Sequence, residues 1–186
     1  METSIIISGF GGQGTLFAGQ VLAYAALDTG KQVTWIPSYG PEMRGGTANC
    51  TVVISDEEIG SPIVRHPTIV LALNLPSLDK YEYMIQPGGL MIANASLINR
   101  EVERAEIDAI HIPANEIAEE LGNMRLANMV AMGAMVTARP FIPLTAVKQA
   151  LEDHLPERHK KLLPANFKAL QHGADFARNV LTTAAA

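Results

Sequence analysis

The stretch from Ile5 to Gly14, IIISGFGGQG, decides the fold. Its apolar run leads directly into glycines at the spacing G-x-G-x-x-G, and the segment from Thr15 to Thr29 has the pattern of a helix. Strand, tight glycine turn and helix N-terminus form the unit in which doubly wound α/β proteins hold the pyrophosphate of a dinucleotide. The chain is therefore predicted to begin with a Rossmann-like βα unit.

The acidic residue that a nicotinamide site requires is missing. Such a residue holds the ribose hydroxyls and normally stands about 20 positions after the glycine turn. Here the second predicted strand, Gln32–Ile36, runs into the sequence PSYGP, and the first carboxylate after it is Glu42. The glycines also have a purely structural interpretation, because they permit positive φ and close packing of helix on strand. Nucleotide binding by the chain alone is thus the weaker interpretation, although the Gln13 amide is placed to bond a ligand or a partner.

Composition limits the class of protein. A chain of 186 residues predicts one domain over residues 1–180, with a frayed tail at 181–186. The charged fraction of 18% is low, which indicates that another chain covers part of the surface. A net charge of -5 argues against nucleic-acid binding, and the sequence has no apolar run long enough to cross a membrane. Because a strand begins almost at the first residue, we expect no signal peptide and a cytoplasmic protein.

Strands and helices alternate along the rest of the chain. Further strands are predicted at Thr47–Ile54, Thr68–Leu73, Leu90–Asn94 and Ala109–Pro113, and further helices at Ser77–Met84, Ala114–Leu121, Asn128–Ala138, Leu144–Leu155 and Pro164–Val180. This alternation predicts a three-layer, Rossmann-like α/β domain with a mainly parallel sheet and helices on both faces.

The loop at residues 38–46, SYGPEMRGG, carries more chemistry than a turn requires. It starts at the carboxyl end of a strand, where open α/β sheets place their sites. Arg44 stands before two glycines and offers a planar cation beside accessible backbone N–H groups, which suits a carboxylate or a phosphate. The alternative is a local ion pair between Arg44 and Glu42 or another nearby acidic residue.

Other candidate residues have weaker signals. Asn49 and Asn74 stand at the ends of predicted strands and either cap loops or touch a ligand. Asn128 is interpreted as the N-cap of the methionine-rich helix. The single cysteine, Cys50, is interpreted as a buried small hydrophobe and cannot hold an iron–sulfur cluster alone. The five histidines have no metal-ligand spacing, so neither a catalytic residue nor a metal site is predicted in this chain alone.

Taken together, the two glycine motifs are far more specific than either alone. Residues 9–14 followed by residues 38–49, SYGPEMRGGTAN, resemble the γ subunit of the 2-oxoacid:ferredoxin oxidoreductases, the pyruvate/ketoisovalerate oxidoreductase type of domain. The resemblance extends from the first strand to about Arg178, and Asn74-Leu75 and the segment Asn128–Gly133 fit the same pattern. The EMRGG form of the second motif is more similar to the 2-oxoglutarate or branched-chain 2-oxoacid members than to the pyruvate members.

The resemblance implies a subunit of a larger enzyme. That enzyme oxidatively decarboxylates a 2-oxoacid, forms an acyl-CoA from coenzyme A and reduces ferredoxin. The α and β subunits hold thiamine diphosphate with magnesium, and iron–sulfur clusters lie in a δ subunit or in β. The isolated chain is expected to be inactive and to bind no cofactor alone. It is also expected to expose a contiguous apolar patch near the two glycine loops and the methionine-rich helix from Asn128, and to form a homodimer through it.

Two alternatives stay open at this point. The chain could be a free-standing nucleotide-binding or NAD(P)-dependent protein, or a scaffolding α/β domain without chemistry. The residues expected to contact cofactor or partner subunits are Gly9, Gly11, Gly12, Gln13, Gly14, Ser38, Tyr39, Gly40, Glu42, Arg44, Gly45, Gly46, Thr47, Asn49, Asn74 and Asn128.

Overall fold

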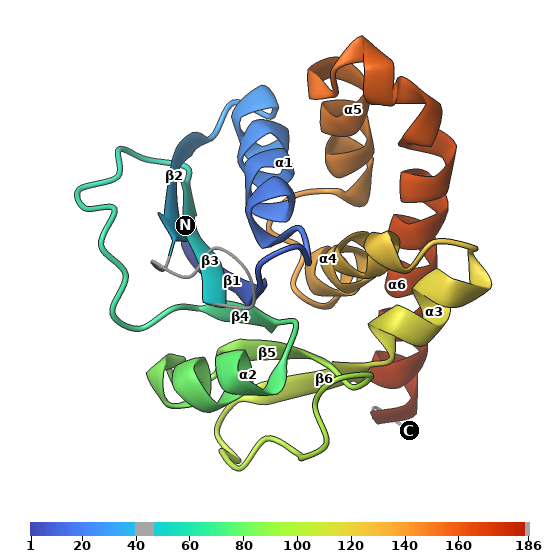
Figure 1. Cartoon of the computed structure of the whole chain (residues 1–186). Coiled ribbons are helices and arrows are strands. Elements are labelled where there is room, and N and C mark those ends of the chain that lie inside the picture. Colours follow the sequence, from blue (N-terminus) through green and yellow to red (C-terminus); the bar gives the residue numbers. More distant parts are fainter. Residues whose placement is uncertain (40–46, 185–186) are drawn as a thin grey trace.

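The computed structural model describes residues 1–39 and 47–184, and shows a single sheet between two layers of helices (Figure 1). The strands are β1 (Glu2–Phe10), β2 (Gln32–Tyr39), β3 (Thr47–Ser55), β4 (Ile69–Ala72), β5 (Leu90–Asn94) and β6 (Asp108–Ile112). The α-helices are α1 (Thr15–Asp28), α2 (Leu75–Tyr81), α3 (Ala114–Glu120), α4 (Ala127–Ala138), α5 (Leu144–His154) and α6 (Leu163–Ala184). Three short 3₁₀ turns join them: η1 (Glu82–Met84), η2 (Met124–Leu126) and η3 (Glu157–Leu162).

The sheet has the strand order β2-β3-β1-β4-β5-β6. The pairs β1–β4, β4–β5 and β5–β6 are parallel, which confirms the predicted three-layer fold with a mainly parallel sheet. Strand β3 is antiparallel to both of its neighbours. Loop length explains why β3 runs antiparallel to β2, because only seven residues separate Tyr39 from Thr47 and a parallel crossover needs a dozen or more.

The two faces of the sheet are covered unequally. Side chains of α1 and α3 to α6 pack on one face, over Ile5, Ile7 and their neighbours. The other face packs against α2 and the segment 95–107, with Ile6, Val70 and Ala72 in its core (Figure 1). Since Ile5, Ile6 and Ile7 are all nearly inaccessible, β1 is buried on both faces of the sheet, as its apolar run indicates.

Helix α4 is apolar on every side and lies buried between α6 and the sheet. Gly133 and Gly173 form the crossing of α4 and α6: a Cβ on Gly133 would collide with the carbonyl group of Leu170, and one on Gly173 with that of Val130. Met129, Met132 and Met135 are fully buried. The expectation that this helix contributes to an exposed apolar patch is therefore wrong.

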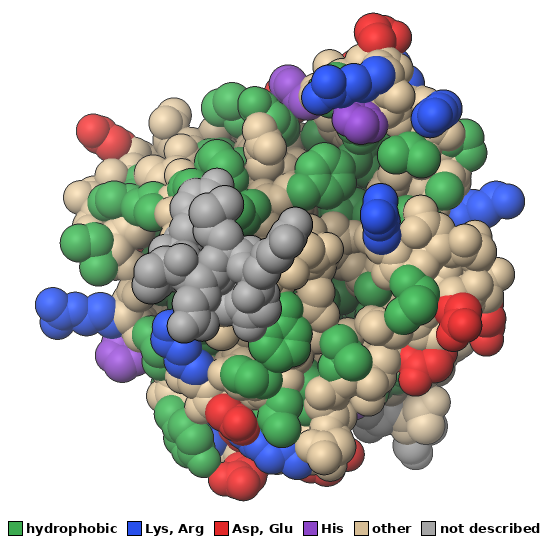
Figure 2. All heavy atoms as spheres, in the orientation of Figure 1, with side chains coloured by type: hydrophobic (Ala, Val, Ile, Leu, Met, Phe, Trp, Pro, Cys, Tyr) green, Lys and Arg blue, Asp and Glu red, His purple; other side chains and the backbone are tan. Residues whose placement is uncertain are grey.

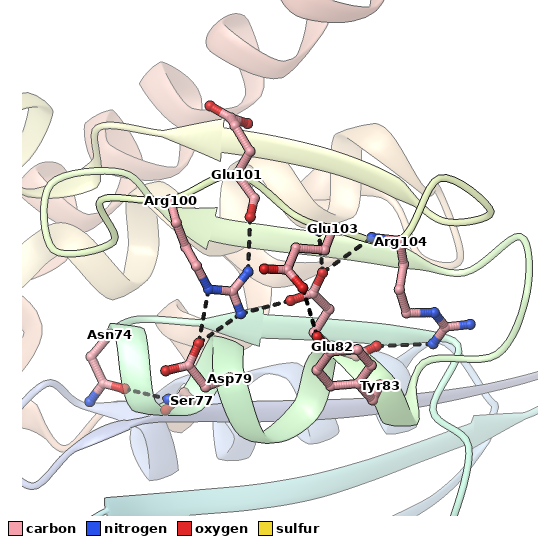
Figure 3. A network of polar contacts seen from close by, with 9 residues as sticks. All are labelled: Asn74, Ser77, Asp79, Glu82, Tyr83, Arg100, Glu101, Glu103 and Arg104. Carbon is pink, nitrogen blue, oxygen red and sulfur yellow. Dashed lines mark hydrogen bonds and ion pairs between the residues drawn. The ribbon is translucent and has the colours of Figure 1, made fainter.

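A buried carboxylate holds the segment 95–107 against α2 and η1 (Figure 3). Glu82 accepts hydrogen bonds from the backbone N–H groups of Glu103 and Arg104, and its second oxygen lies 2.8 Å from the Arg100 guanidinium. Arg100 also binds Asp79 through its Nε at 2.9 Å. This network supports the fold and lies along α2, away from the glycine turn.

The last turns of α6 include residues 181–184 of the predicted tail. The division into one domain at 1–180 and a frayed tail stays a prediction.

Candidate functional site

The carboxyl ends of β1 and β4 define the candidate site. After β1 the chain passes into α1 on one face of the sheet, and after β4 it passes into α2 on the other face. The two connections therefore diverge between these strands, and such a switch point leaves a crevice in which open α/β proteins bind ligands. The glycine turn at residues 9–14 lies at this edge.

The glycine turn has the backbone geometry that its sequence predicts. Gly12 and Gly14 have φ angles of 98° and 76°, which side-chain-bearing residues rarely adopt. Gly14 is the N-cap of α1 and its carbonyl accepts from the N–H of Ala18 at 2.9 Å. A Cβ at Gly9 would come within 3.0 Å of the Leu73 Cβ, so this glycine permits the close approach of β1 and β4.

Asn128, the second residue of α4, holds the glycine turn in place through its side chain. Its Nδ2 donates to the Gly14 carbonyl at 3.1 Å, and its Oδ1 accepts from the N–H of Met129 at 2.8 Å. The N-cap interpretation of Asn128 is wrong, because α4 begins one residue earlier and Leu126 occupies the cap position. The side chain joins α4 to the glycine turn across 114 positions of sequence, a contact that local patterns cannot indicate.

The Gln13 amide faces the chain's own backbone. Its Oε1 accepts from the N–H of Phe10 at 2.6 Å and its Nε2 donates to the Leu73 carbonyl at 3.3 Å. These bonds tie the turn to the ends of β1 and β4. A role for Gln13 toward a ligand or a partner stays a prediction.

The second predicted loop begins and ends beside the glycine turn. Thr47 pairs with Phe10, and Asn49 stands between Ser8 of β1 and Ser38 of β2 in the sheet. Ser38 and the backbone of Tyr39 end β2 at the same edge. The predicted site residues Gly40, Glu42, Arg44, Gly45 and Gly46 lie outside the described residues.

Asn74 has the capping role that was one of its two interpretations. Its Oδ1 accepts from the N–H of Ser77 at 2.9 Å, which makes it the N-cap of α2 (Figure 3). The Ser77 hydroxyl lies 2.8 Å from that of Ser8 and links the helix start to β1. The Asn74 side chain is buried, and its Nδ2 has no hydrogen-bond partner within residues 1–39 and 47–184.

A small cavity of about 150 Å³ opens beside the glycine turn, with Gly12 and Gln13 in its lining. Three further polar residues line it that the sequence interpretation missed: Asn94, Asn115 and Arg125. Asn94 is fully buried, and its Nδ2 donates to the Leu73 carbonyl at 3.2 Å and to Asn115 Oδ1 at 3.0 Å. Its position as the last residue of a parallel strand, like Asn74 after β4, was the signal that could have found it.

Among the described residues lining the cavity at this edge, the polar groups are neutral amides and backbone groups together with one cation, Arg125. Cys50 is buried near Trp35 and Gly19, and burial raises the pKa of its thiol to about 11, so the thiol stays protonated near neutral pH. Within the described ranges, no cluster of three or more His, Cys, Asp or Glu side chains could hold a metal ion. None of the described helices is long and apolar enough to cross a membrane.

Comparison with known proteins identifies the family. The model of the family described as pyruvate ferredoxin/flavodoxin oxidoreductase matches residues 4–176. The chain belongs to this family. A solved structure of the keto/oxoacid ferredoxin oxidoreductase γ subunit from Geobacter sulfurreducens superposes with a TM-score of 0.81 at 31% identity, covering 95% of this chain and 99% of that one. The resemblance carried by the two glycine motifs is thereby confirmed.

Two relatives within the oxidoreductase family differ in how much of their length they share with this chain. The ketoisovalerate oxidoreductase subunit VorA of Methanothermobacter marburgensis is 38% identical over 97% of this chain, but the chain spans only 37% of VorA. The 2-oxoglutarate synthase subunit KorC of the same organism is 36% identical over 94% of this chain and 96% of its own length. The domain thus occurs both as a separate subunit and as part of a longer polypeptide.

Proposed function

We propose that this chain is the γ-type subunit of a multi-subunit 2-oxoacid:ferredoxin oxidoreductase. The observation that carries the proposal is the similarity to KorC over nearly the whole length of both chains. In the proposed reaction a 2-oxoacid and coenzyme A give an acyl-CoA and carbon dioxide, and two electrons pass to ferredoxin. The names of KorC and VorA favour 2-oxoglutarate or a branched-chain 2-oxoacid as the substrate.

The cofactors are proposed to lie in partner subunits. An iron–sulfur cluster needs several thiolates, whereas this chain has one cysteine, whose thiol is buried and has a pKa of about 11. The residues of this chain therefore do not fit a cluster. Thiamine diphosphate with magnesium is assigned to the α and β subunits, and the clusters to β or to a δ subunit.

The role proposed for this chain is to position partner loops and anionic groups. Hydrogen bonds from Asn128 and Gln13 fix the backbone of its glycine turn, so the edge formed by β1 and β4 offers a surface of defined shape to partner loops. Arg44 follows in the second loop motif. A guanidinium stays protonated and cannot act as a general base, but it can hold a carboxylate or phosphate in a bidentate grip. Arg44→Lys keeps the charge and loses the fork, whereas Arg44→Ala loses both.

Co-purification tests the assignment. The chain carrying an affinity tag is expressed with candidate α and β subunits, and mass spectrometry of the eluted complex gives their stoichiometry. We expect a stable complex that contains the thiamine-diphosphate-binding subunits. Absence of such a complex would remove the basis of the proposal.

Calorimetric titration with NADH separates the proposal from a free-standing dinucleotide-binding protein. Because no carboxylate follows the second strand to hold the ribose, we expect the dissociation constant of the isolated chain to be well above about 1 μM, equivalent to roughly -8 kcal/mol. Tighter binding would favour the alternative.

We also propose that the isolated chain self-associates and that the complex is cytoplasmic. Phe10 and Phe17 are partly exposed beside the glycine turn, and Met124 is exposed on η2. An apolar surface of this kind marks an interface when it is contiguous. Light scattering of the purified chain at high concentration would show a dimer, and a monodisperse monomer would contradict self-association.

A further inference from the structure

A second, larger hollow, called the groove below, lies next to the β1–β4 edge, between α1, α5, the N-terminal part of α6 and the turns η2 and η3. Its volume is about 550 Å³, within the range of roughly 300–1,000 Å³ that concave binding sites occupy. The floor is apolar and includes Val21 of α1 and Leu151 of α5, both buried. Figure 2 shows a hollow on this face below a group of histidine and Lys or Arg side chains at the top of the view.

One wall of the groove is aromatic. The rings of Tyr24 and His154 stack with centroids 4.0 Å apart and planes 6° from parallel. His154 Nε2 lies 2.8 Å from Asp28 Oδ2, so the imidazole is held in this orientation. Phe17 lies on the same helix as Tyr24 and is 38% exposed. These rings provide a rigid apolar surface for an anchoring side chain.

The rim of the groove is cationic. Arg125 and Arg158 line it, and neither forms an ion pair with a carboxylate in the part of the chain that the structure describes. By contrast Arg100, Arg104, Arg139 and Arg178 each bind an Asp or Glu. Arg158 Nε donates to His159 Nε2 at 3.1 Å, and the described lining includes no Asp or Glu. In a chain of net charge -5, two uncompensated arginines at one groove indicate complementarity to an acidic occupant.

The apolar surface extends past the groove. Leu162 at its edge is 40% exposed, and Met124, adjacent to Arg125, is 56% exposed. Met124 and Arg125 also line the small cavity at the glycine turn, so the surface continues to the β1–β4 edge. A small ligand seated in the hollow would leave this surface uncovered, whereas a polypeptide segment could cover both.

We propose that this groove docks a short acidic segment of a partner subunit. An apolar or aromatic side chain of that segment packs between the Tyr24–His154 stack and Phe17, and its carboxylates face Arg125 and Arg158. Arginine forms bidentate bonds with carboxylates and is enriched at protein interfaces, where buried side chains anchor the contact. The inference rests on the proposed function, because the segment belongs to the same oxidoreductase.

Charge reversal tests the rim. Arg158→Glu places a negative charge at the groove, and Lys168→Glu makes the same reversal at an exposed position of α6 that does not line it. Binding of each variant to the purified partner subunits is measured by biolayer interferometry at low and high salt. We expect Arg158→Glu to weaken binding at least about tenfold at low salt, with Lys168→Glu within about twofold of wild type. Salt should weaken wild-type binding more than binding of Arg158→Glu, because it screens the arginine–carboxylate attraction.

Photo-crosslinking identifies the occupant. In the assembled complex, benzoylphenylalanine replaces Phe17. In a control complex it replaces Tyr83, which is exposed on the other face of the sheet. We expect the Phe17 position to crosslink to a partner segment rich in Asp and Glu. Equal binding of Arg158→Glu and Lys168→Glu, or a crosslink to an uncharged or basic segment or to a second copy of this chain, would overturn the inference alone. Failure of the wild-type chain to bind the partner subunits would overturn the proposed function as well.

Discussion

The contact between Gly14 and Asn128 predicts a measurable coupling. Gly14→Ala imposes a left-handed backbone on alanine, which costs about 1–2 kcal/mol, partly offset by the stiffer unfolded chain. The new Cβ would also collide with the Asn128 amide, which has to leave its hydrogen bond to the Gly14 carbonyl, for roughly 1 kcal/mol more. We expect a total near 2 kcal/mol.

Gly30→Ala is the matched control. Gly30 has nearly the same φ, 83°, but a Cβ there would have no atom within 4 Å. It therefore measures the backbone strain alone, expected near 1 kcal/mol. Asn128→Ala removes the bond to the Gly14 carbonyl and the one that Oδ1 accepts from Met129 N–H. The Gly14 carbonyl keeps its bond from Ala18, so we expect a cost of about 1 kcal/mol.

Urea unfolding followed by the fluorescence of Trp35, the single tryptophan, gives the free energy of unfolding for each variant. Since Gly14→Ala already breaks the bond that Asn128→Ala removes, the double variant should be about 1 kcal/mol less destabilised than the sum. Gly30→Ala and Asn128→Ala should simply add. The reasoning is refuted if Gly14→Ala costs no more than Gly30→Ala, or if its effect adds to that of Asn128→Ala.

Three further predictions concern packing, the buried carboxylate and the thiol. Gly133→Ala forces the Leu170 backbone away from α4, and we expect the free energy of unfolding in urea to fall by about 1–3 kcal/mol. An unchanged urea midpoint would contradict the close crossing of α4 and α6 at this glycine. Glu82→Ala leaves two backbone N–H groups and Arg100 without their buried partner, so we expect the free energy of unfolding to fall by roughly 3–5 kcal/mol. Asp79→Ala removes the exposed partner of the same arginine and should lower it by under about 1 kcal/mol. Because the pKa of Cys50 is about 11, only about one thiol in a thousand is ionised at pH 8. We therefore expect an aromatic disulfide reagent to label Cys50 only after the chain unfolds. Rapid labelling of the native chain would show that the thiol is accessible.

Periodicity and turn chemistry predicted much of the fold. The strand Leu90–Asn94 has the predicted bounds, and α1 ends just before Gly30, whose positive φ suits the position after a helix. The antiparallel β3 was readable from the short loop before it, although strand–helix alternation alone did not indicate it.

The candidate site was predictable only where it is local. The glycine turn could be found because its φ angles depend on residues 9–14 themselves. Asn128 was misassigned because its role depends on Gly14. Arg125 was missed because its place in two cavities follows from the packing of η2 against α3, α4 and α6. Sequence patterns give the apolar character of α4 but not its burial on every side, which is why its methionines suggested an exposed interface.

The activity of the assembled oxidoreductase tests the central claim most directly. Partner subunits are purified with and without this chain, and the reduction of ferredoxin that depends on both 2-oxoacid and coenzyme A is followed by absorbance. The account predicts no activity from this chain alone, and activity from the partner subunits that appears or rises at least tenfold when the chain is added. Partner subunits that turn over equally well without it, or 2-oxoacid oxidation by the isolated chain, would contradict the account.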